Sequence, residues 1–97
     1  MDTSKLFSLE GRVALVTGGS RNLGRTIAEA YIAQGATVYI TSRKAADCER
    51  TAEELGPRCH ALPQDVSTVE GAQALARAYA ERENKLDILV NNAGAAW

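Results

Sequence analysis

Features that mark several protein classes are scarce in this sequence. Lysine and arginine number 11 against 12 acidic residues, so there is no basic excess of the kind that binds nucleic acid or anionic membranes. Apolar runs are no longer than a strand, and residues 1–8 lack the pattern of a signal peptide. We therefore expect a cytoplasmic protein with no nucleic-acid partner and no membrane partner.

Cysteine and histidine are also scarce. Cys48 and Cys59 lie eleven positions apart, and His60 is the only histidine. A structural metal site needs about four ligands at closer spacings. We expect two reduced, partly buried thiols and no metal site.

Apolar residues are plentiful, at 45% of the chain, and their spacing alternates between strand and helix. The 97 residues are enough for one domain at most. Continuous or β-branched apolar runs predict strands, and apolar positions three and four apart predict helices. The expected strands are 13–16, 37–41, 60–63 and 86–90, and the expected helices are 23–34, 44–55 and a third that ends near residue 82.

Local signals place the ends of these elements. Ser67 and Glu70 have the spacing of a capping box, with Ser67 as the cap of the third helix. Its buried face would carry Val69, Ala72, Leu75 or Ala76, and Tyr79. Pro63 pushes the third strand toward the edge of the sheet, since proline cannot donate to a strand ladder.

The order of these elements predicts the fold. Strands that alternate with helices of this length form a parallel sheet through right-handed crossovers. The expected class is α/β, a Rossmann-type doubly wound sheet with the strand order 3-2-1-4. In this arrangement a ligand crevice lies between the first and fourth strands.

The stretch Thr17–Gly24, TGGSRNLG, lies between the first strand and the first helix. Glycine permits the sharp change of direction, and a helix N-terminus offers free N–H groups and partial positive charge to a phosphate. The alternative is a glycine-rich turn that binds nothing.

This turn resembles the TGxxxGxG turn of the short-chain dehydrogenase/reductase family. Two further stretches match family motifs in the same order, Asp65-Val66 after the third strand and the NNAG sequence at 91–94 after the fourth. The resemblance covers essentially the whole chain. Within the family the chain resembles bacterial 3-oxoacyl-acyl-carrier-protein reductases, in particular those of the rhamnolipid-biosynthesis branch, and sugar-alcohol or gluconate dehydrogenases stay open.

The resemblance implies a dinucleotide site. Gly18 and Gly24 would form the turn and let the helix approach, and Asp65 would hydrogen-bond the adenine beside Val66. The phosphates would be lined by Ser20, Arg21 and Leu23, and the adenosine ribose by Asn91, Ala93 and Gly94. Asn91 and Asn92 would also brace the central strands.

One position departs from the family pattern. Asn22 stands where the middle glycine of the turn is usual. Asparagine tolerates left-handed backbone angles better than other side chains do. We expect the turn to form, with its pyrophosphate contact open to change at Asn22.

The end of the second strand predicts NADP(H) rather than NAD(H). NAD-preferring sites of this kind carry an acidic residue there, whereas this sequence has Ser42, Arg43 and Lys44, with no carboxylate before Asp47. The guanidinium of Arg43 can pair with a 2′-phosphate, and Arg21 supplies a second cation. The alternative is that Arg43 is a solvated residue at a helix start.

The family's catalytic Tyr-x-x-x-Lys pair is absent from these residues. The residues four positions after Tyr31, Tyr39 and Tyr79 are Gly35, Arg43 and Glu83, and we expect Tyr31 and Tyr79 to lie in the core. We expect residues 1–97 to be the cofactor-binding first part of one Rossmann domain, inactive alone and unstable or self-associating because the fourth strand leaves an open edge. The alternative is a non-catalytic NADP(H)-binding module. In the complete enzyme the resemblance implies a small-molecule or acyl-thioester substrate and a tetramer.

Overall fold

The structure, a computed structural model, describes residues 8–92, in which strands and helices strictly alternate. The strands are β1 (Val13–Thr17), β2 (Thr37–Thr41), β3 (Cys59–Ala61) and β4 (Ile88–Asn91), and the helices are α1 (Asn22–Ala33), α2 (Ala45–Leu55) and α3 (Val69–Arg82). All four strands pair in parallel in the order β3-β2-β1-β4. The predicted α/β class and strand order are therefore confirmed.

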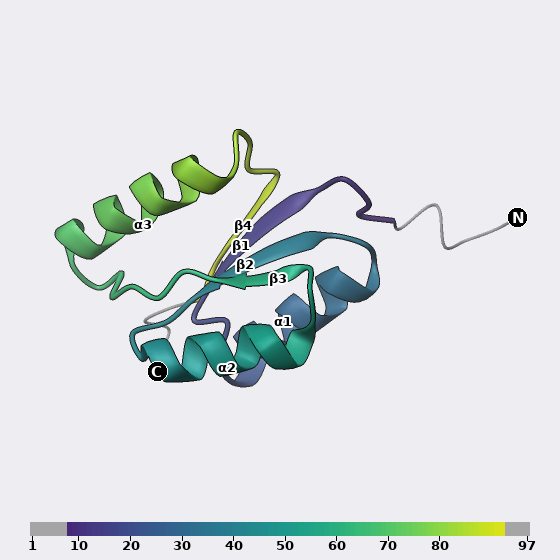
Figure 1. Ribbon diagram of the computed structural model, residues 1–97, viewed down its shortest axis with the longest axis horizontal. Helices are drawn as coiled ribbons and strands as arrows, with labels where there is room; N and C mark the ends of the chain where they lie inside the picture. The colour runs from purple at the N-terminus through teal and green to yellow at the C-terminus, as the bar shows by residue number, and fades with distance from the viewer. Residues whose placement is uncertain (1–7, 93–97) are drawn as a thin grey trace, which may run out of the picture.

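The sheet is the middle of three layers. Helices α1 and α2 cover one face, and α3 covers the other (Figure 1). Successive side chains of a strand point to opposite faces, so Val16 and Ile40 pack toward α1 and α2, whereas Leu15 and Tyr39 pack toward α3. Every residue of β1 is buried, which explains its continuous apolar sequence.

The two faces have separate cores. Cys48 and Ala52 of α2 pack with Cys59 of β3 on one face, and both cysteines are buried and free, where we had expected only partial burial. Leu75 and Tyr79 of α3 pack on the other, where the Tyr79 ring meets Tyr39 edge-on with the centroids 5.2 Å apart. Tyr79 is thus a core residue as predicted. Tyr31 was also expected in the core, but it is only half-buried against the α1 and α2 side.

The start of α3 differs from the prediction. Thr68, not Ser67, is the cap, and its hydroxyl oxygen accepts a hydrogen bond from the N–H of Gly71 at 3.0 Å. The Ser67 side chain is directed at Asp65, to which its hydroxyl donates at 2.6 Å. The predicted buried face was also wrong at Val69, which is 68% exposed, and at Ala72, which is exposed as well. The buried residues of α3 are Gly71, Leu75 and Tyr79.

The two edge strands are shorter than predicted. β3 lies at the edge of the sheet, as predicted, but ends before Leu62 and Pro63. β4 starts at Ile88 rather than Leu86, because the Asp87 carboxylate accepts a hydrogen bond from the Val13 N–H at 2.8 Å and anchors the entry to the strand. Across residues 8–92, no helix has the length and apolar content needed to cross a membrane.

Candidate functional site

The glycine-rich turn joins β1 to α1 at the carboxyl edge of the sheet. Gly18 has a φ of 68°, in the left-handed region where glycine carries no steric penalty. The N–H groups of Gly18 and Gly19 both donate to the Thr41 carbonyl, at 2.8 and 3.3 Å. These two bonds attach the turn to the end of β2, so two segments implicated by the sequence lie side by side.

Asn22 also has left-handed backbone geometry. Its φ is 52°, and it is the one non-glycine residue with a positive φ among residues 8–92. The asparagine at the departing position of the motif therefore adopts the conformation that the turn requires. The turn forms without a glycine there.

Gly24 lies where α1 comes closest to the turn. A Cβ at this position would lie 2.1 Å from the Gly18 carbonyl oxygen and 2.8 Å from Nδ2 of Asn92. Backbone atoms cannot move aside as a flexible side chain can. Any larger residue would push α1 away from the turn and from the end of β4.

The second half of the turn, residues 20–24, has unpaired backbone N–H groups. Among residues 8–92, no acceptor reaches the amides of residues 20–24, and no side chain caps α1. Free amides at a helix N-terminus carry partial positive charge, which favours an anion. Leu23, within this run, is 63% exposed.

An open cleft of about 870 Å³ extends from this turn across the ends of the strands. Its walls come from the turn, from the residues that follow β2 and β3, and from the end of β4. The lining residues are Gly18, Ser20, Arg21, Thr41, Ser42, Arg43, Lys44, Asp47, Gln64, Asp65, Val66, Ser67 and Asn91.

Most of the site residues expected from the sequence share this cleft. Those at its wall are Gly18, Ser20, Arg21, Arg43, Asp65, Val66 and Asn91. Asn22, Leu23 and Gly24 are at the start of α1 and do not line it. Ala93 and Gly94 lie outside the described residues.

Sequence reasoning missed the remaining lining residues. Lys44 was noted only for its charge, and Thr41, Ser42, Asp47, Gln64 and Ser67 were not assigned to the site. Thr41 ends β2, and Ser42, Lys44 and Gln64 lie within three residues of the end of β2 or β3. Ligands of open α/β sheets bind outside the carboxyl ends of the strands. Their position relative to the strand ends was the available signal.

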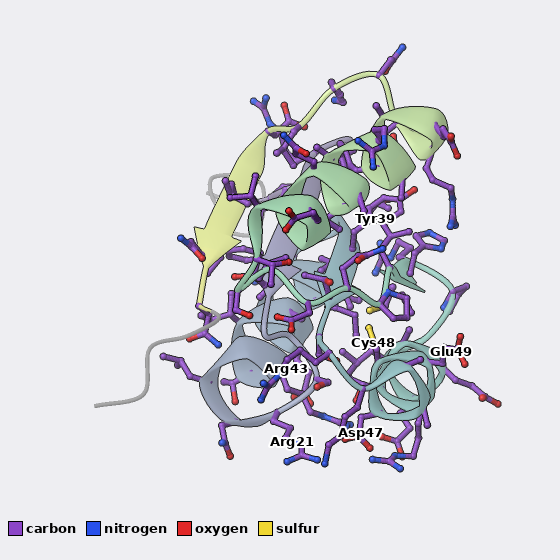
Figure 2. All side chains as sticks on the ribbon, turned by 90° about the vertical axis from the view of Figure 1, so that its left-hand side faces the viewer. Arg21, Tyr39, Arg43, Asp47, Cys48 and Glu49 are labelled. Atoms are coloured by element: carbon purple, nitrogen blue, oxygen red, sulfur yellow. The ribbon has the colours of Figure 1, made fainter. Side chains whose placement is uncertain are left out.

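Arg21 is paired within the protein. Its Nη2 atom lies 2.6 Å from Oδ2 of Asp47, and Arg50 binds the other oxygen of the same carboxylate at 2.9 Å. Figure 2 shows Arg21 beside Asp47, with Arg43 nearby. The hydrogen bond from Arg21 is the main cause that lowers the pKa of Asp47. The acid that follows β2 is therefore charged and already shared by two arginines.

Arg43 differs from Arg21 because it makes no ion pair within the described part of the chain. Its side chain is exposed at the cleft wall. Its charge is a minor contributor to the lowered pKa of Asp65. Arg43 is thus an available cation on the same cleft as the turn.

The Asp65 carboxylate is held on one side only. The N–H and the hydroxyl of Ser67 both donate to Oδ1 of Asp65, at 3.0 and 2.6 Å. The Ser67 hydroxyl is the main cause that lowers the pKa of Asp65, so the group is an anion at neutral pH. Its other oxygen has no donor among residues 8–92 and can accept one from a ligand.

The last residue of β4, Asn91, and the next residue, Asn92, connect β4 to β1. The Thr17 hydroxyl contacts Oδ1 of Asn91 at 3.2 Å, and the Asn92 N–H donates to the Thr17 oxygen at 2.8 Å. The Asn92 side chain also reaches the Gly18 carbonyl at 3.5 Å. These contacts fix the ends of β1 and β4 at the edge of the sheet where the cleft lies.

The arrangement suits anion and nucleotide binding rather than metal chemistry. Free amides, an unpaired arginine and a half-saturated carboxylate line one cleft. Within the described residues no group of three or more His, Cys, Asp or Glu side chains could hold a metal ion.

Known oxidoreductases are similar to this chain over most of its length. The rhamnolipids biosynthesis 3-oxoacyl-[acyl-carrier-protein] reductase of Pseudomonas aeruginosa is 50% identical over 93 residues, which are 94% of this chain and 36% of that protein. The sorbitol dehydrogenase of Cereibacter sphaeroides is 39% identical over 88% of this chain and 33% of its own length. The chain therefore spans about a third of the length of these relatives.

Solved structures agree. The Pseudomonas aeruginosa RhlG/NADP active-site complex superposes with a TM-score of 0.90 at 48% identity, covering 99% of this chain and 39% of that one. A 3-ketoacyl-(acyl-carrier-protein) reductase from Brucella melitensis, complexed with NADH, gives a TM-score of 0.79 at 38% identity, over 84% of this chain and 34% of that one. The family model described as short chain dehydrogenase matches residues 12–97. The chain belongs to the short chain dehydrogenase family.

Proposed function

We propose that residues 1–97 are the first, cofactor-binding part of a single Rossmann domain in an NADP(H)-dependent oxidoreductase. Hydride would pass between the nicotinamide and a carbonyl or alcohol group of the substrate, for which we favour a 3-oxoacyl thioester. The observation that carries the proposal is the exposed, unpaired Arg43 on the cleft that begins at the free amides of the turn.

The residues present suit a dinucleotide with a 2′-phosphate. The amides of residues 20–24 would hold the pyrophosphate, with Ser20, Arg21, Asn22 and Leu23 around it. Arg43 would pair with the 2′-phosphate, because its guanidinium suits phosphate geometry and is free of ion pairs within residues 8–92. Asp47, the first acid after β2 in the sequence, is already shared by two arginines.

The adenine and the ribose of the cofactor would contact the remaining cleft residues. Asp65 would accept a hydrogen bond from the adenine amino group beside Val66, and Asn91 would flank the ribose, with Ala93 and Gly94 beyond the described residues. The nicotinamide supplies or accepts the hydride. The described residues bind and orient the cofactor, and the proton transfer belongs to residues outside this chain.

The substrate assignment follows the names of the relatives. Two of them, from Pseudomonas aeruginosa and Vibrio harveyi, are named 3-oxoacyl-[acyl-carrier-protein] reductases. The sorbitol dehydrogenase relative makes a sugar alcohol the second candidate. We extend the proposal to a cytoplasmic homotetramer, as the family resemblance implies. A non-catalytic NADP(H)-binding module is the alternative from another functional class.

The experiment uses the protein made from its complete coding sequence. We expect kcat/KM with a 3-oxoacyl thioester to be higher with NADPH than with NADH, and oxidation of sorbitol to be slower. A preference for NADH would contradict the cofactor assignment. NADPH binding without turnover of either substrate would favour the non-catalytic module.

Arg43→Ala tests the residue that carries the proposal. A hydrogen bond to a charged group contributes about 1.5–3 kcal/mol, so we expect NADPH affinity to fall about tenfold or more. NADH affinity should stay within twofold, because NADH lacks the 2′-phosphate. Isothermal titration calorimetry measures both. The control is Arg77→Ala, since Arg77 is an exposed arginine of α3 away from the cleft.

A further inference from the structure

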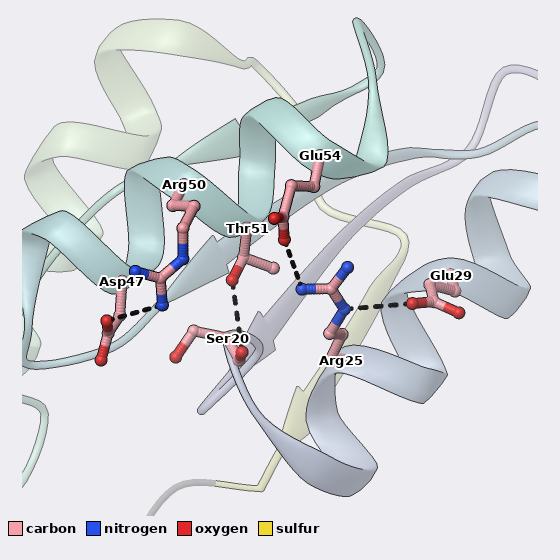
Figure 3. Close-up of polar contacts among 7 residues, drawn as sticks. All are labelled: Ser20, Arg25, Glu29, Asp47, Arg50, Thr51 and Glu54. Carbon is pink, nitrogen blue, oxygen red and sulfur yellow. Dashed lines mark hydrogen bonds and ion pairs between the residues drawn. The ribbon is translucent and has the colours of Figure 1, made fainter.

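One face of α2 contacts the glycine-rich turn and α1 through polar side chains. Asp47, Thr51 and Glu54 are four and three positions apart, a spacing that places them on the same side of a helix. Asp47 pairs with Arg21, and Glu54 pairs with Arg25 at 2.8 Å. Between them, the Thr51 hydroxyl donates to the Ser20 carbonyl at 3.2 Å (Figure 3).

Burial separates the central contact from its two neighbours. Thr51 is 1% exposed, whereas the Glu54 side chain is 50% exposed and the Arg21 side chain 62%. Exposed ion pairs contribute little, because water solvates and screens both charges. The Thr51 side chain is buried and its bond to the Ser20 carbonyl is part-buried, so water replaces this bond less readily than it replaces an exposed ion pair. Of the three contacts, the Thr51 bond is therefore the one that most restrains the turn.

This bond fixes a peptide plane at the phosphate-binding position. The peptide that joins Ser20 to Arg21 is planar and trans, so its N–H points opposite to its carbonyl. With the carbonyl directed at α2, the Arg21 N–H must point away from α2. That N–H belongs to the run of free amides over residues 20–24. Its direction decides whether the amides can converge on one anion.

We propose that Thr51 is a positioning residue that orients the phosphate-binding turn for the pyrophosphate of the cofactor. The inference rests on the proposed function and extends it to a residue of α2 that does not line the cleft. The pyrophosphate is common to NADPH and NADH. Loss of the Thr51 hydroxyl therefore weakens both cofactors by the same factor, unlike loss of Arg43.

The sharpest comparison is Thr51→Ser against Thr51→Cys in the protein made from its complete coding sequence. Both variants lose the γ-methyl group, and they differ only in a hydroxyl against a thiol, which is a weak donor. By titration calorimetry we expect Thr51→Ser to bind NADPH and NADH within twofold of the unmodified protein. Thr51→Cys should raise both dissociation constants about fivefold, the effect of one hydrogen bond.

Two controls separate positioning from stability. Glu54→Gln removes a half-exposed ion pair of the same α2 face and should leave both dissociation constants within twofold. Circular dichroism melting identifies the temperature range in which each variant is folded. A purely structural role would lower the melting temperature and leave the dissociation constants of the folded protein unchanged. Thr51→Val, whose side chain has no donor, replaces Thr51→Cys if the latter does not fold.

The outcomes distinguish the two proposals. If the unmodified protein binds neither cofactor, the proposed function fails and this inference fails with it. If the unmodified protein binds but folded Thr51→Cys binds as tightly as Thr51→Ser, only the positioning role of Thr51 is overturned. A loss confined to NADPH would also overturn it, because the effect would then lie at the 2′-phosphate.

Discussion

Asn22, with its φ of 52°, shows how one residue can keep a glycine-dependent turn without a glycine. Most side chains lose roughly 1–2 kcal/mol in the left-handed region, because Cβ approaches the following carbonyl. Asparagine loses less, since its short polar side chain can bond locally. The departure from the family motif therefore leaves the path of the backbone unchanged.

At the residue scale, we expect Asn22→Ala to lower the free energy of unfolding by about 1 kcal/mol. Asn22→Gly is the matched variant and should leave stability within about 0.5 kcal/mol, because glycine adopts the same angles without strain. Urea denaturation followed by circular dichroism measures both. Equal stabilities of the alanine and glycine variants would show that the positive φ carries no strain.

The start of α3 shows the difference between a local signal and its tertiary outcome. The sequence offers two adjacent hydroxyl residues, Ser67 and Thr68, and the capping-box spacing favours the first. In the structure the Asp65 carboxylate takes both donors of Ser67, and Thr68 becomes the cap. A pattern of four residues could not include this competition, because Asp65 lies outside it.

At the element scale, the two hydroxyls should therefore have unequal effects on stability. Thr68→Ala removes the cap of α3 and should cost about 1 kcal/mol of unfolding free energy. Ser67→Ala, the neighbouring control, removes an exposed contact and should cost less than about 0.5 kcal/mol. The melting temperatures of the two variants provide the measurement. The reverse order would restore Ser67 as the cap.

Periodicity predicted the elements well because it reflects burial. The all-buried β1 and the half-buried α3 both leave a regular apolar pattern, and their types and order were correct. Contacts between distant side chains leave no such pattern. Nothing in the sequence indicates that Arg21 pairs with Asp47, or that Thr51 bonds Ser20, since each partner lies on a different element.

The same distinction holds for the candidate site. The segments that end strands could be predicted, because topology brings the carboxyl ends of parallel strands to one edge. The sequence could not predict which cation stays free within the cleft, because that depends on the partners of each side chain. Arg21 and Arg43 look equivalent in the sequence, yet among residues 8–92 only Arg21 has an acidic partner.

For the molecule as a whole, the sheet has one apolar edge. Among the described residues β4 pairs with β1 alone, and Leu89 and Leu86 are 59% and 41% exposed. An exposed strand edge with apolar side chains readily pairs with another chain. Helices α1 and α2 cover one face of the sheet (Figure 1). On the other face α3 leaves β4 uncovered, since Leu89 is in register with Leu15 of that face and stays exposed.

We therefore expect residues 1–97, produced as an isolated polypeptide, to self-associate. Leu89→Lys should shift the population toward monomer, because a charge on an edge strand opposes pairing. Size-exclusion chromatography with light scattering measures the mass. Leu23→Lys alters a comparably exposed leucine outside β4 and should change the mass little. A cooperative thermal transition from a monomer would contradict the expectation.

The two cysteines buried between α2 and β3 give the molecule an internal reporter. Burial raises the pKa of the Cys59 thiol to about 11, so the thiolate is scarce at neutral pH and the folded form reacts slowly with alkylating reagents. Modification must then wait for α2 to separate from the sheet. The labelling rate therefore reports how often α2, which holds the phosphate-binding turn, separates from the sheet. A bound cofactor that stabilises the packing of α2 on the sheet slows the labelling in proportion to the fraction of the protein that has cofactor bound.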